Sequence, residues 1–254
     1  MTTIPFDARR ARLLAYVPWM LRDYLTNQGP ATLIVVLLIG YMALMPVLDG
    51  PLDIPLGDVP PEMAHRILLA ILPAFAFLGP FFATNGIIAN DRKFSYYRFL
   101  FSKPLSPIAY YVTTFLVYGI GVFVVTFVLM GVWALAVRPM FPGTILVVVA
   151  IMYIAFGGIG FLLSAAWRFD WLSLVTVILV ANIGWLVWGK AEGIRHWVLY
   201  LLPPVHRDDQ VFALLSQTPN DALPWASILW LGSYGLVCFI LGMIVVRRRP
   251  LGSS

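Results

Sequence analysis

The segment NDRKFSYYRFLFSKPLS, residues 90–106, lies between two long apolar runs and breaks their pattern. It holds five charged residues interleaved with five aromatic ones, and Pro104 comes near its end. Aromatic rings and long basic side chains gather where a membrane meets water, because each has an apolar body and a polar end. We therefore expect this segment to lie at a membrane surface and to contact another molecule there.

The composition indicates that the whole chain is a polytopic membrane protein. Of its 254 residues, 61% are hydrophobic and 11% are charged, and the mean hydropathy is +0.87. Soluble domains are about 45–50% apolar and about 25% charged. The single cysteine, Cys238, lies in an apolar run, so the chain has neither a disulfide framework of its own nor a thiolate metal cluster.

Six apolar runs are predicted to be transmembrane helices of an all-α protein, since each can cross a bilayer core of roughly 30 Å. They cover residues 31–48, 66–89, 108–137, 143–166, 172–189 and 225–246. Residues 1–29 mix arginines with apolar side chains, which predicts either a helix lying in the membrane interface or a basic anchor for the first span. We expect one transmembrane domain over 1–254, with an interfacial segment (1–29), a six-span bundle (30–246) and a tail (247–254).

The loop at 190–224 precedes the last predicted span and contains two short apolar stretches, 194–202 and 211–215. Both are too short to cross a membrane, so we expect interfacial or re-entrant helices there. His196 and His206 also lie in this loop, ten residues apart and without cysteines nearby. That spacing favours surface histidines over metal ligands, and we predict no metal site.

The basic residues are divided unevenly between the two sides that six spans create. Twelve of the seventeen lysines and arginines fall on the side that holds both termini, and five fall on the other. Cytoplasmic loops of membrane proteins carry an excess of Lys and Arg. We therefore expect both termini, and the 90–106 segment with them, to be cytoplasmic.

Polar side chains are scarce inside the predicted spans. Their middles hold no Asp, Glu, Lys or Arg. Ionisable residues at depth mark proton relays and ion paths, so this pattern argues against a proton-coupled or sodium-coupled carrier. Asn85 and Asn182 are the best buried polar candidates, predicted to join helices by hydrogen bonds or to face a translocation path.

Three glycines, Gly157, Gly158 and Gly160, cluster in the fourth predicted span and are followed by Ser164. Small residues at such spacing allow two helices to approach closely. We favour packing between helices of this chain over an interface between subunits.

No catalytic motif is found, and we predict that the chain is not an enzyme. It has no GxxxxGK[ST] phosphate loop, so it does not bind a nucleotide in that way. It also lacks HExxH and GxSxG. The acids and histidines of the 190–224 loop leave a lipid-modifying membrane enzyme as a minor alternative.

The 87–111 stretch, IIANDRKFSYYRFLFSKPLSPIAYY, resembles the membrane subunits of type-2 ATP-binding-cassette (ABC) exporters. In that family an acidic residue closes the second span, a short coupling helix carries basic residues, and a Pro-Leu-Ser-like turn leads into the third span. Asp91 stands at the acidic position here, basic residues follow it, and 104–106 read Pro-Leu-Ser. The chain differs in having Asp where the family usually has Glu, and Phe94-Ser95 where it has a Gly-Thr pair.

The resemblance implies a function and a set of partners. It implies a permease subunit that moves a hydrophobic or amphiphilic substrate across the bacterial inner (plasma) membrane. The permease would pair with a second copy or a paralogue, and two cytosolic ATPase subunits would hold the ATP and Mg²⁺; no cofactor in this chain and no nucleic acid is expected. The residues expected to couple to the ATPase are Asp91, Arg92, Lys93, Phe94, Tyr97, Arg98 and Phe101.

Two alternatives remain beside this interpretation. The same basic and aromatic residues would also suit a helix lying on the lipid headgroups. A non-transporting membrane scaffold that recruits a cytosolic partner would have the same topology. An ATPase with a phosphate loop encoded beside this chain would favour the transporter.

Overall fold

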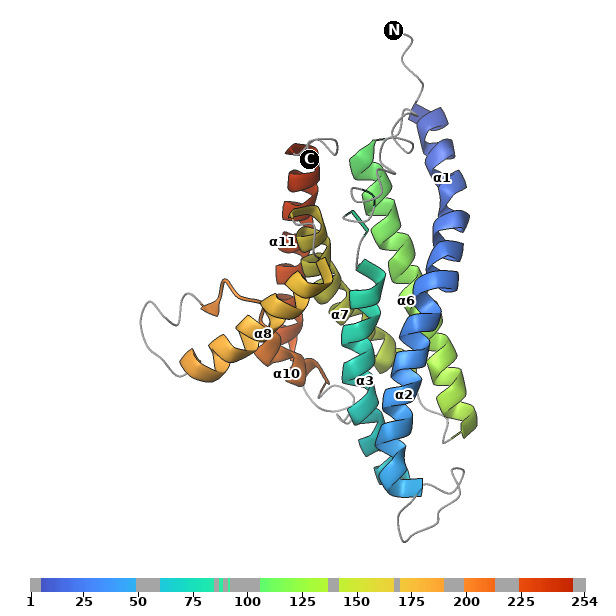
Figure 1. Ribbon diagram of the computed structural model, residues 1–254, viewed down its shortest axis with the longest axis vertical. Helices are drawn as coiled ribbons and strands as arrows, with labels where there is room; N and C mark the ends of the chain where they lie inside the picture. Colours follow the sequence, from blue (N-terminus) through green and yellow to red (C-terminus); the bar gives the residue numbers. More distant parts are fainter. Residues whose placement is uncertain are drawn as a thin grey trace.

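The structure is a computed structural model that describes residues 6–48, 60–84, 87, 88, 91, 106–136, 142–166, 170–189, 199–212 and 224–248. Within these ranges every regular element is a helix, which confirms the all-α prediction. Figure 1 shows an elongated bundle of helices, with α8 strongly inclined and pointing away from the others.

The long helices are α1 (Phe6–Asp23), α2 (Gly29–Leu48), α3 (Pro61–Thr84), α6 (Pro107–Ala136), α7 (Pro142–Ala166), α8 (Asp170–Trp188) and α11 (Trp225–Arg248). The short ones are η1 (Tyr24–Gln28), η3 (Val205–Arg207) and α10 (Asp208–Phe212). Three of the long helices begin at a proline, whose fixed φ suits a first helical residue that has no intrahelical N–H bond to lose. α3 begins and ends five residues before the predicted 66–89 span, and the other boundaries after residue 100 agree within a few residues.

Four of the described helices are long and apolar enough to cross a membrane: Leu14–Met42, Pro107–Leu135, Gly143–Ala166 and Trp225–Arg248. The apolar parts of α3 and α8 are shorter, at Ile71–Thr84 and Val175–Trp188. These helices fit a membrane protein.

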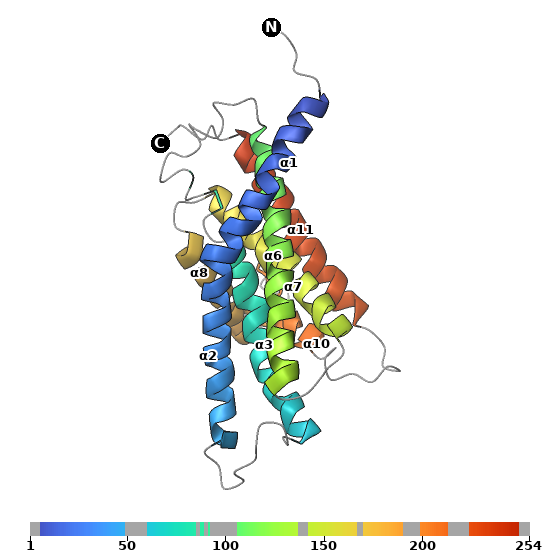
Figure 2. The same ribbon diagram turned by 90° about the vertical axis from the view of Figure 1, so that its right-hand side faces the viewer.

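The N-terminal part of the chain differs from its prediction. α1 runs through η1 into α2 without a loop, and the apolar helix that could cross a membrane includes residues before Ala31. Figure 2 shows α1 inclined to α2 but continuous with it. The predicted N-terminal segment is thus a helix continuous with α2 whose apolar residues pack along α6. Whether it lies in the membrane interface or anchors the first span stays a prediction.

α7 and α11 make the closest helix pair, and glycines allow it. A Cβ atom built on Gly158 of α7 would lie 2.7 Å from the carbonyl carbon of Gly235 in α11. A Cβ on Gly235 would in turn lie 2.5 Å from the Cα of Ala155. Real Cβ atoms do not approach backbone this closely, so the contact requires glycine on both sides. Packing within the chain is thus confirmed for Gly158.

A group of aromatic rings joins three helices in the centre of the bundle. The ring centroids of Phe115 (α6) and Phe239 (α11) lie 4.5 Å apart, and those of Phe161 (α7) and Phe239 lie 4.7 Å apart. Tilted and edge-to-face pairs at such distances add about 0.5–1.5 kcal/mol each beyond simple burial. This group ties α6, the helix that follows the 90–106 segment, to α7 and α11.

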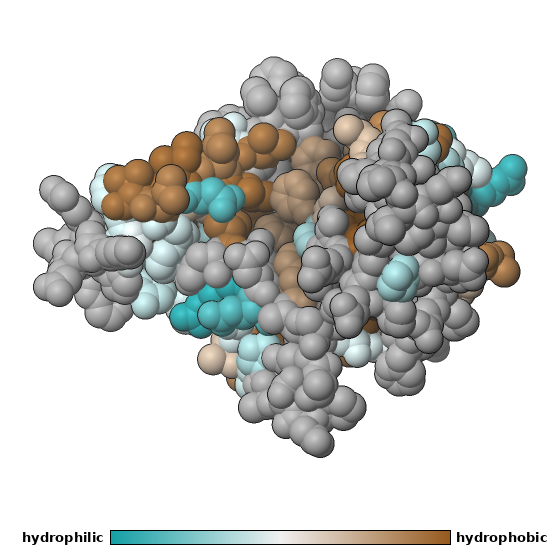
Figure 3. Space-filling view, turned by 90° about the horizontal axis from the view of Figure 1, so that it is seen from below, coloured by the Kyte–Doolittle hydropathy of each residue, from teal (hydrophilic) through white to brown (hydrophobic). Residues whose placement is uncertain are grey.

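The surface between the two ends of the bundle is apolar. Exposed large apolar side chains include Ile34, Leu38, Leu116, Ile120, Phe127, Leu179, Ile183, Leu186, Leu236, Val237 and Ile240. Figure 3, which looks at the lower end of the molecule, shows a broad brown area of such side chains on one side. An exposed apolar surface of this extent is expected where lipid, and not water, surrounds the helices.

Candidate functional site

The turn that leaves α3 is fixed onto α7. The backbone N–H of Ile87 donates to the carbonyl of Thr84 at 3.4 Å, and that of Ile88 donates to Ser164 Oγ at 3.1 Å. Ile88 is fully buried. A buried N–H group left without a partner costs about 1–3 kcal/mol, so Ser164 stabilises this path of the chain.

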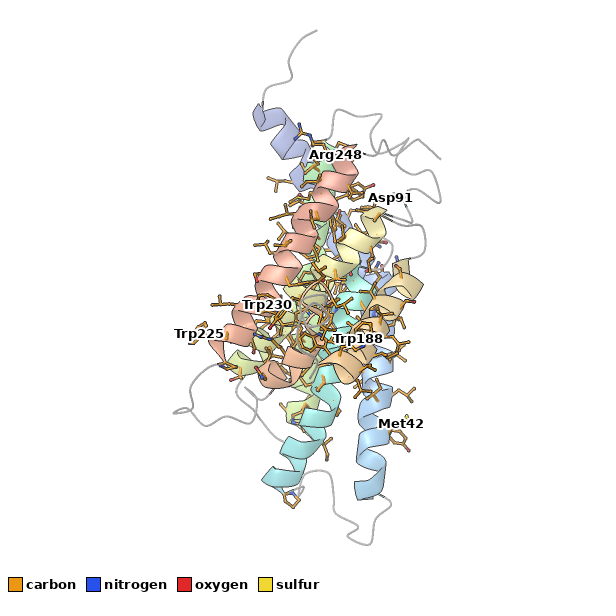
Figure 4. All side chains as sticks on the ribbon, turned by 90° about the vertical axis from the view of Figure 1, so that its left-hand side faces the viewer. Met42, Asp91, Trp188, Trp225, Trp230 and Arg248 are labelled. Atoms are coloured by element: carbon orange, nitrogen blue, oxygen red, sulfur yellow. The ribbon has the colours of Figure 1, made fainter. Side chains whose placement is uncertain are left out.

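Asp91 follows this turn and is bonded to α6. The hydroxyl of Tyr111 donates to Asp91 Oδ2 at 3.1 Å. Burial raises the pKa of Asp91 from 3.8 to about 6, and the hydrogen bond from Tyr111 opposes part of that rise. The first predicted coupling residue is therefore a half-buried carboxylate held against α6, at the end of the bundle where Arg248 also lies (Figure 4).

The other predicted coupling residues, Arg92, Lys93, Phe94, Tyr97, Arg98 and Phe101, lie outside the described residues, as does Asn85. The description resumes at Ser106, whose carbonyl accepts a hydrogen bond from the N–H of Tyr110 at 3.0 Å in the first turn of α6. The N-terminal flank of the predicted coupling segment is thus bonded to α6 and α7, and its C-terminal flank leads directly into the first turn of α6.

One face of α6 carries Tyr111, Thr114, Tyr118 and Gly121, which we call the tyrosine face. These residues are three or four apart, so they lie along one side of the helix. The Tyr118 hydroxyl donates to Asp23 Oδ2 at 3.1 Å. This face therefore bonds two carboxylates from elsewhere in the chain, Asp91 through Tyr111 and Asp23 through Tyr118.

Asp23 ends α1 and has a second partner on its own helix. Asn27 Nδ2 donates to Asp23 Oδ1 at 2.7 Å. Asp23 and Asp91 thus both bond to α6, through tyrosines two helical turns apart. Asp23 lies within the Leu14–Met42 helix. The argument against ion-coupled transport relied on spans without charged residues, so it does not apply to this helix.

Two tyrosine rings lie against glycines of α6. A Cβ on Gly121 would lie 2.6 Å from Tyr24 Cε1 and closer still to Cδ1. A Cβ on Gly119 would lie 2.9 Å from Tyr153 Cε1. The Tyr153 hydroxyl donates to the Phe115 carbonyl at 2.5 Å. The sequence Tyr118-Gly119-Ile120-Gly121 therefore supplies one hydroxyl donor and two glycines without a Cβ. We call the space beside each glycine, which a ring from another helix fills, a notch.

Two buried polar atoms beside this face have no hydrogen-bond partner among the described residues: the Tyr24 hydroxyl and Gln28 Oε1. Thr32 Oγ1 donates to the Gln28 backbone carbonyl at 3.0 Å and lies near the Tyr24 hydroxyl, but no hydrogen bond of regular geometry joins the two hydroxyls. Tyr24 itself is completely buried. Each such atom costs about 1–3 kcal/mol relative to a bonded one.

Sequence reasoning missed the roles of Asp23 and Tyr118. Asp23 was assigned to an interfacial segment, where a carboxylate would simply face water. The signal in the sequence was the seven-residue spacing of Tyr111 and Tyr118 in an otherwise apolar run, which places two hydroxyls on one helix face.

Asn182 is exposed, which corrects the expectation that it is buried. Its Nδ2 donates to the carbonyl of Ile178 on its own helix at 3.0 Å. The reason is the position of α8, which inclines away from the bundle so that only Ala181 and Gly184 of its described residues are buried. No hydrogen bond from Asn182 to another described helix is observed.

The opposite part of the molecule holds an aromatic group around η3. The Arg207 guanidinium lies 5.5 Å from the ring centroid of Trp230, and Tyr200 packs edge-on against the same ring. The Tyr234 hydroxyl donates to the Leu201 carbonyl at 2.8 Å, and Ser227 bonds Gln210. The described part of the 190–224 loop is thus folded against α11, near the level of Trp188 and Trp225 in Figure 4.

Among the described residues, no three His, Cys, Asp or Glu side chains gather as a metal-binding group would require. No protein family, curated protein or solved structure matches the chain. The candidate site is therefore defined by geometry alone: the anchored N-terminal flank of the 90–106 segment and the tyrosine face beside it.

Proposed function

We propose that the chain is the permease subunit of an ABC exporter, and that a separate cytosolic ATPase acts on it through the 90–106 segment. The observation that carries the proposal is the attachment of the N-terminal flank of this segment to two helices, while its C-terminal flank continues directly into α6. Asp91 is bonded to Tyr111, and the N–H of Ile88 to Ser164, so a force applied to the segment would reach α6 and α7 directly. A segment that only lay on lipid would need no such attachment.

In this proposal six apolar helices cross the membrane. Four are the long helices given above, and the other two are α3 and α8. The beginning of α1 and the end of α11 lie at the same end of the bundle (Figure 1), which fits an even number of crossings. The excess of Lys and Arg assigns that end to the cytoplasm. Residues 92–105 would then project from the cytoplasmic face of the plasma membrane, in a bacterial cell the inner membrane.

The partners follow from what the chain lacks. Without a phosphate loop it depends on ATPase subunits that hold the ATP and Mg²⁺. One chain of this size would enclose a path only together with a second copy or a paralogue, so the working unit would be two permeases on two ATPases. The absence of charged residues from the middles of the six predicted spans favours a hydrophobic or amphiphilic substrate.

The decisive experiment is purification of the tagged chain from its own cells in mild detergent, followed by mass spectrometry. We expect an ATPase subunit at a ratio near one to one. Reversal of charge at Arg92 and Arg98 should remove it, because basic side chains at an interface pair with acidic partners. Reversal at Arg247 and Arg248 is the matched control: both are exposed at the same end of the molecule and should retain the ATPase.

Two results would overturn the proposal. If no ATPase is recovered from a well-solubilised sample, the chain is better explained as a membrane scaffold, with residues 90–106 on the lipid surface. If the ATPase is recovered but the Arg92 and Arg98 reversals retain it, the coupling site lies elsewhere. If the ATPase is recovered but its ATP hydrolysis responds to no lipid, peptide or drug, the assignment as an exporter is refuted.

A further inference from the structure

The helix formed by α1, η1 and α2 changes its hydrogen-bond pattern at Tyr24–Gln28. The N–H of Gly29 donates to the carbonyl of Tyr24, five residues back instead of four. Pro30 follows and has no N–H to donate, and its ring would crowd the carbonyl four residues earlier. Wide turns of this kind and prolines are the usual causes of sharp bends in helices, and they are frequent at functional sites.

The bend falls where α1 changes direction relative to α2, as Figure 2 shows. On the α1 side of the bend, contacts to α6 hold the helix. The Tyr118 hydroxyl donates to Asp23 at 3.1 Å, and Thr114 Oγ1, which donates to the Tyr110 carbonyl at 3.0 Å, contacts the Met20 sulfur at 3.7 Å. Within the bend, Tyr24 fills the notch at Gly121.

We propose that Tyr24–Gln28 is a hinge on which α1 pivots against α6, and that the Asp23–Tyr118 hydrogen bond together with Tyr24 in the Gly121 notch is the latch that holds the observed position. Pro18 in α1 and Pro46 in α2 also lack an N–H, but at Tyr24–Gln28 the wide turn and Pro30 act together, so the regular i→i−4 bonds are weakened over more than one turn.

The unbonded atoms at the hinge are the reason to expect a second position. The Tyr24 hydroxyl and Gln28 Oε1 are both buried without partners in the latched position. A pivot that removes Tyr24 from the notch would bring water or a neighbouring group to both atoms, which opposes the loss of the Asp23–Tyr118 bond and of the packing at Gly121. The latched position stays the more stable one, and this compensation keeps the second position accessible.

The latch is connected to the candidate coupling segment through α6. Tyr111 and Tyr118 lie on the same face two turns apart, one bonded to Asp91 and the other to Asp23. A displacement of the segment at Asp91 would move the start of α6 and with it the donor of the latch. The hinge itself rests on the described contacts alone and does not depend on the proposed transport function.

The test measures the position of α1 directly. Spin labels at Trp19 on α1 and Leu241 on α11, both exposed, report their separation in lipid nanodiscs of the full chain with Cys238 replaced by Ala. We expect two distances, with the latched one dominant. Tyr118→Phe removes only the latch hydroxyl and should increase the second population about threefold or more. Pro30→Ala, which restores an N–H at the hinge, should reduce it.

The matched control is Tyr153→Phe, which deletes a buried hydroxyl that bonds α6 but not across the hinge. It should leave both populations unchanged. If Tyr118→Phe fails to fold, Asn27→Ala serves instead, since Asn27 is exposed and holds the other oxygen of Asp23. A single narrow distance that none of these variants changes would refute the hinge. So would an equal response to Tyr153→Phe. No ATPase or transport assay enters either result.

Discussion

The ring of Tyr24 occupies the space that any side chain on Gly121 would need. The two residues are 97 positions apart in sequence, and they bring the bend of the N-terminal helix against the middle of α6. Neighbouring Gly119 admits Tyr153 in the same way, so two successive notches determine where rings from two other helices lie. Packing in a membrane depends on close approach of this kind, because lipid gives apolar side chains no reason to leave it.

Gly121→Ala should therefore destabilise the protein by about 2 kcal/mol, the usual effect of overpacking a close contact. The measurement is thermal unfolding in detergent, followed by tryptophan fluorescence. Gly131→Ala is the matched control on the same helix, since a Cβ there meets nothing within 4 Å; it should raise stability by a fraction of a kcal/mol through helix propensity. The double variant Tyr24→Ala/Gly121→Ala should lose less stability than the sum of the two single losses, because the ring and the methyl group compete for one space. Equal melting temperatures for the two glycine variants would contradict the notch.

A similar prediction concerns the contact of α7 with α11, and its control is a glycine one helical turn away. Gly235→Ala would push a methyl group into the backbone of α7 at Ala155, and neither backbone can yield locally. We expect a loss of about 3 kcal/mol or failure to fold. Gly232→Ala lies on the same helix with open space around it and should be tolerated. A Gly235→Ala protein as stable as the Gly232→Ala protein would show that these helices are further apart.

Asp91 makes a prediction about pH. Its pKa is raised by burial from 3.8 to about 6, so the folded protein binds this proton more tightly than the unfolded chain does. Protonation therefore stabilises the fold: the contribution is complete below about pH 3.8 and is lost as the pH rises through about 6. Asp91→Asn keeps an acceptor for the Tyr111 hydroxyl but carries no charge at any pH.

We expect Asp91→Asn to be more stable than the wild type at pH 8, and the advantage to narrow by about 1 kcal/mol on going to pH 5. Melting temperatures of the two proteins, measured in parallel across this range, give the difference. Because all other groups are the same in both proteins, their titration cancels. A difference that stays constant from pH 5 to pH 8 would mean that Asp91 is not buried.

The positions of the helices could be predicted from the sequence because unbroken apolar runs with prolines at their starts have few alternatives in a membrane. The continuity of α1 with α2 could not, since Arg22 and Asp23 interrupt the apolar pattern and only the partner Tyr118 shows how a carboxylate is accommodated there. The notch at Gly121 is equally invisible in sequence: a glycine in an apolar run acquires its role from a ring that arrives from 97 residues away. The spacing of apolar residues predicts which face of a single helix is buried. It does not predict which residues of two helices meet, and this candidate site is formed by such contacts.

Ser164 gives the last prediction, which concerns the path out of α3. Ser164→Ala removes the acceptor of the Ile88 N–H, which belongs to a fully buried residue. The loss of about 1–3 kcal/mol should be local, because the turn at 87–88 can open while α7 stays folded. Hydrogen exchange followed by mass spectrometry should show faster exchange in peptides that cover Ile88 and Asp91. Ser233→Ala is the control, since that exposed hydroxyl bonds only the carbonyl of Trp230 on its own helix. If both variants leave exchange at Ile88 unchanged, Ser164 does not anchor the turn and the flank of the 90–106 segment is free to move.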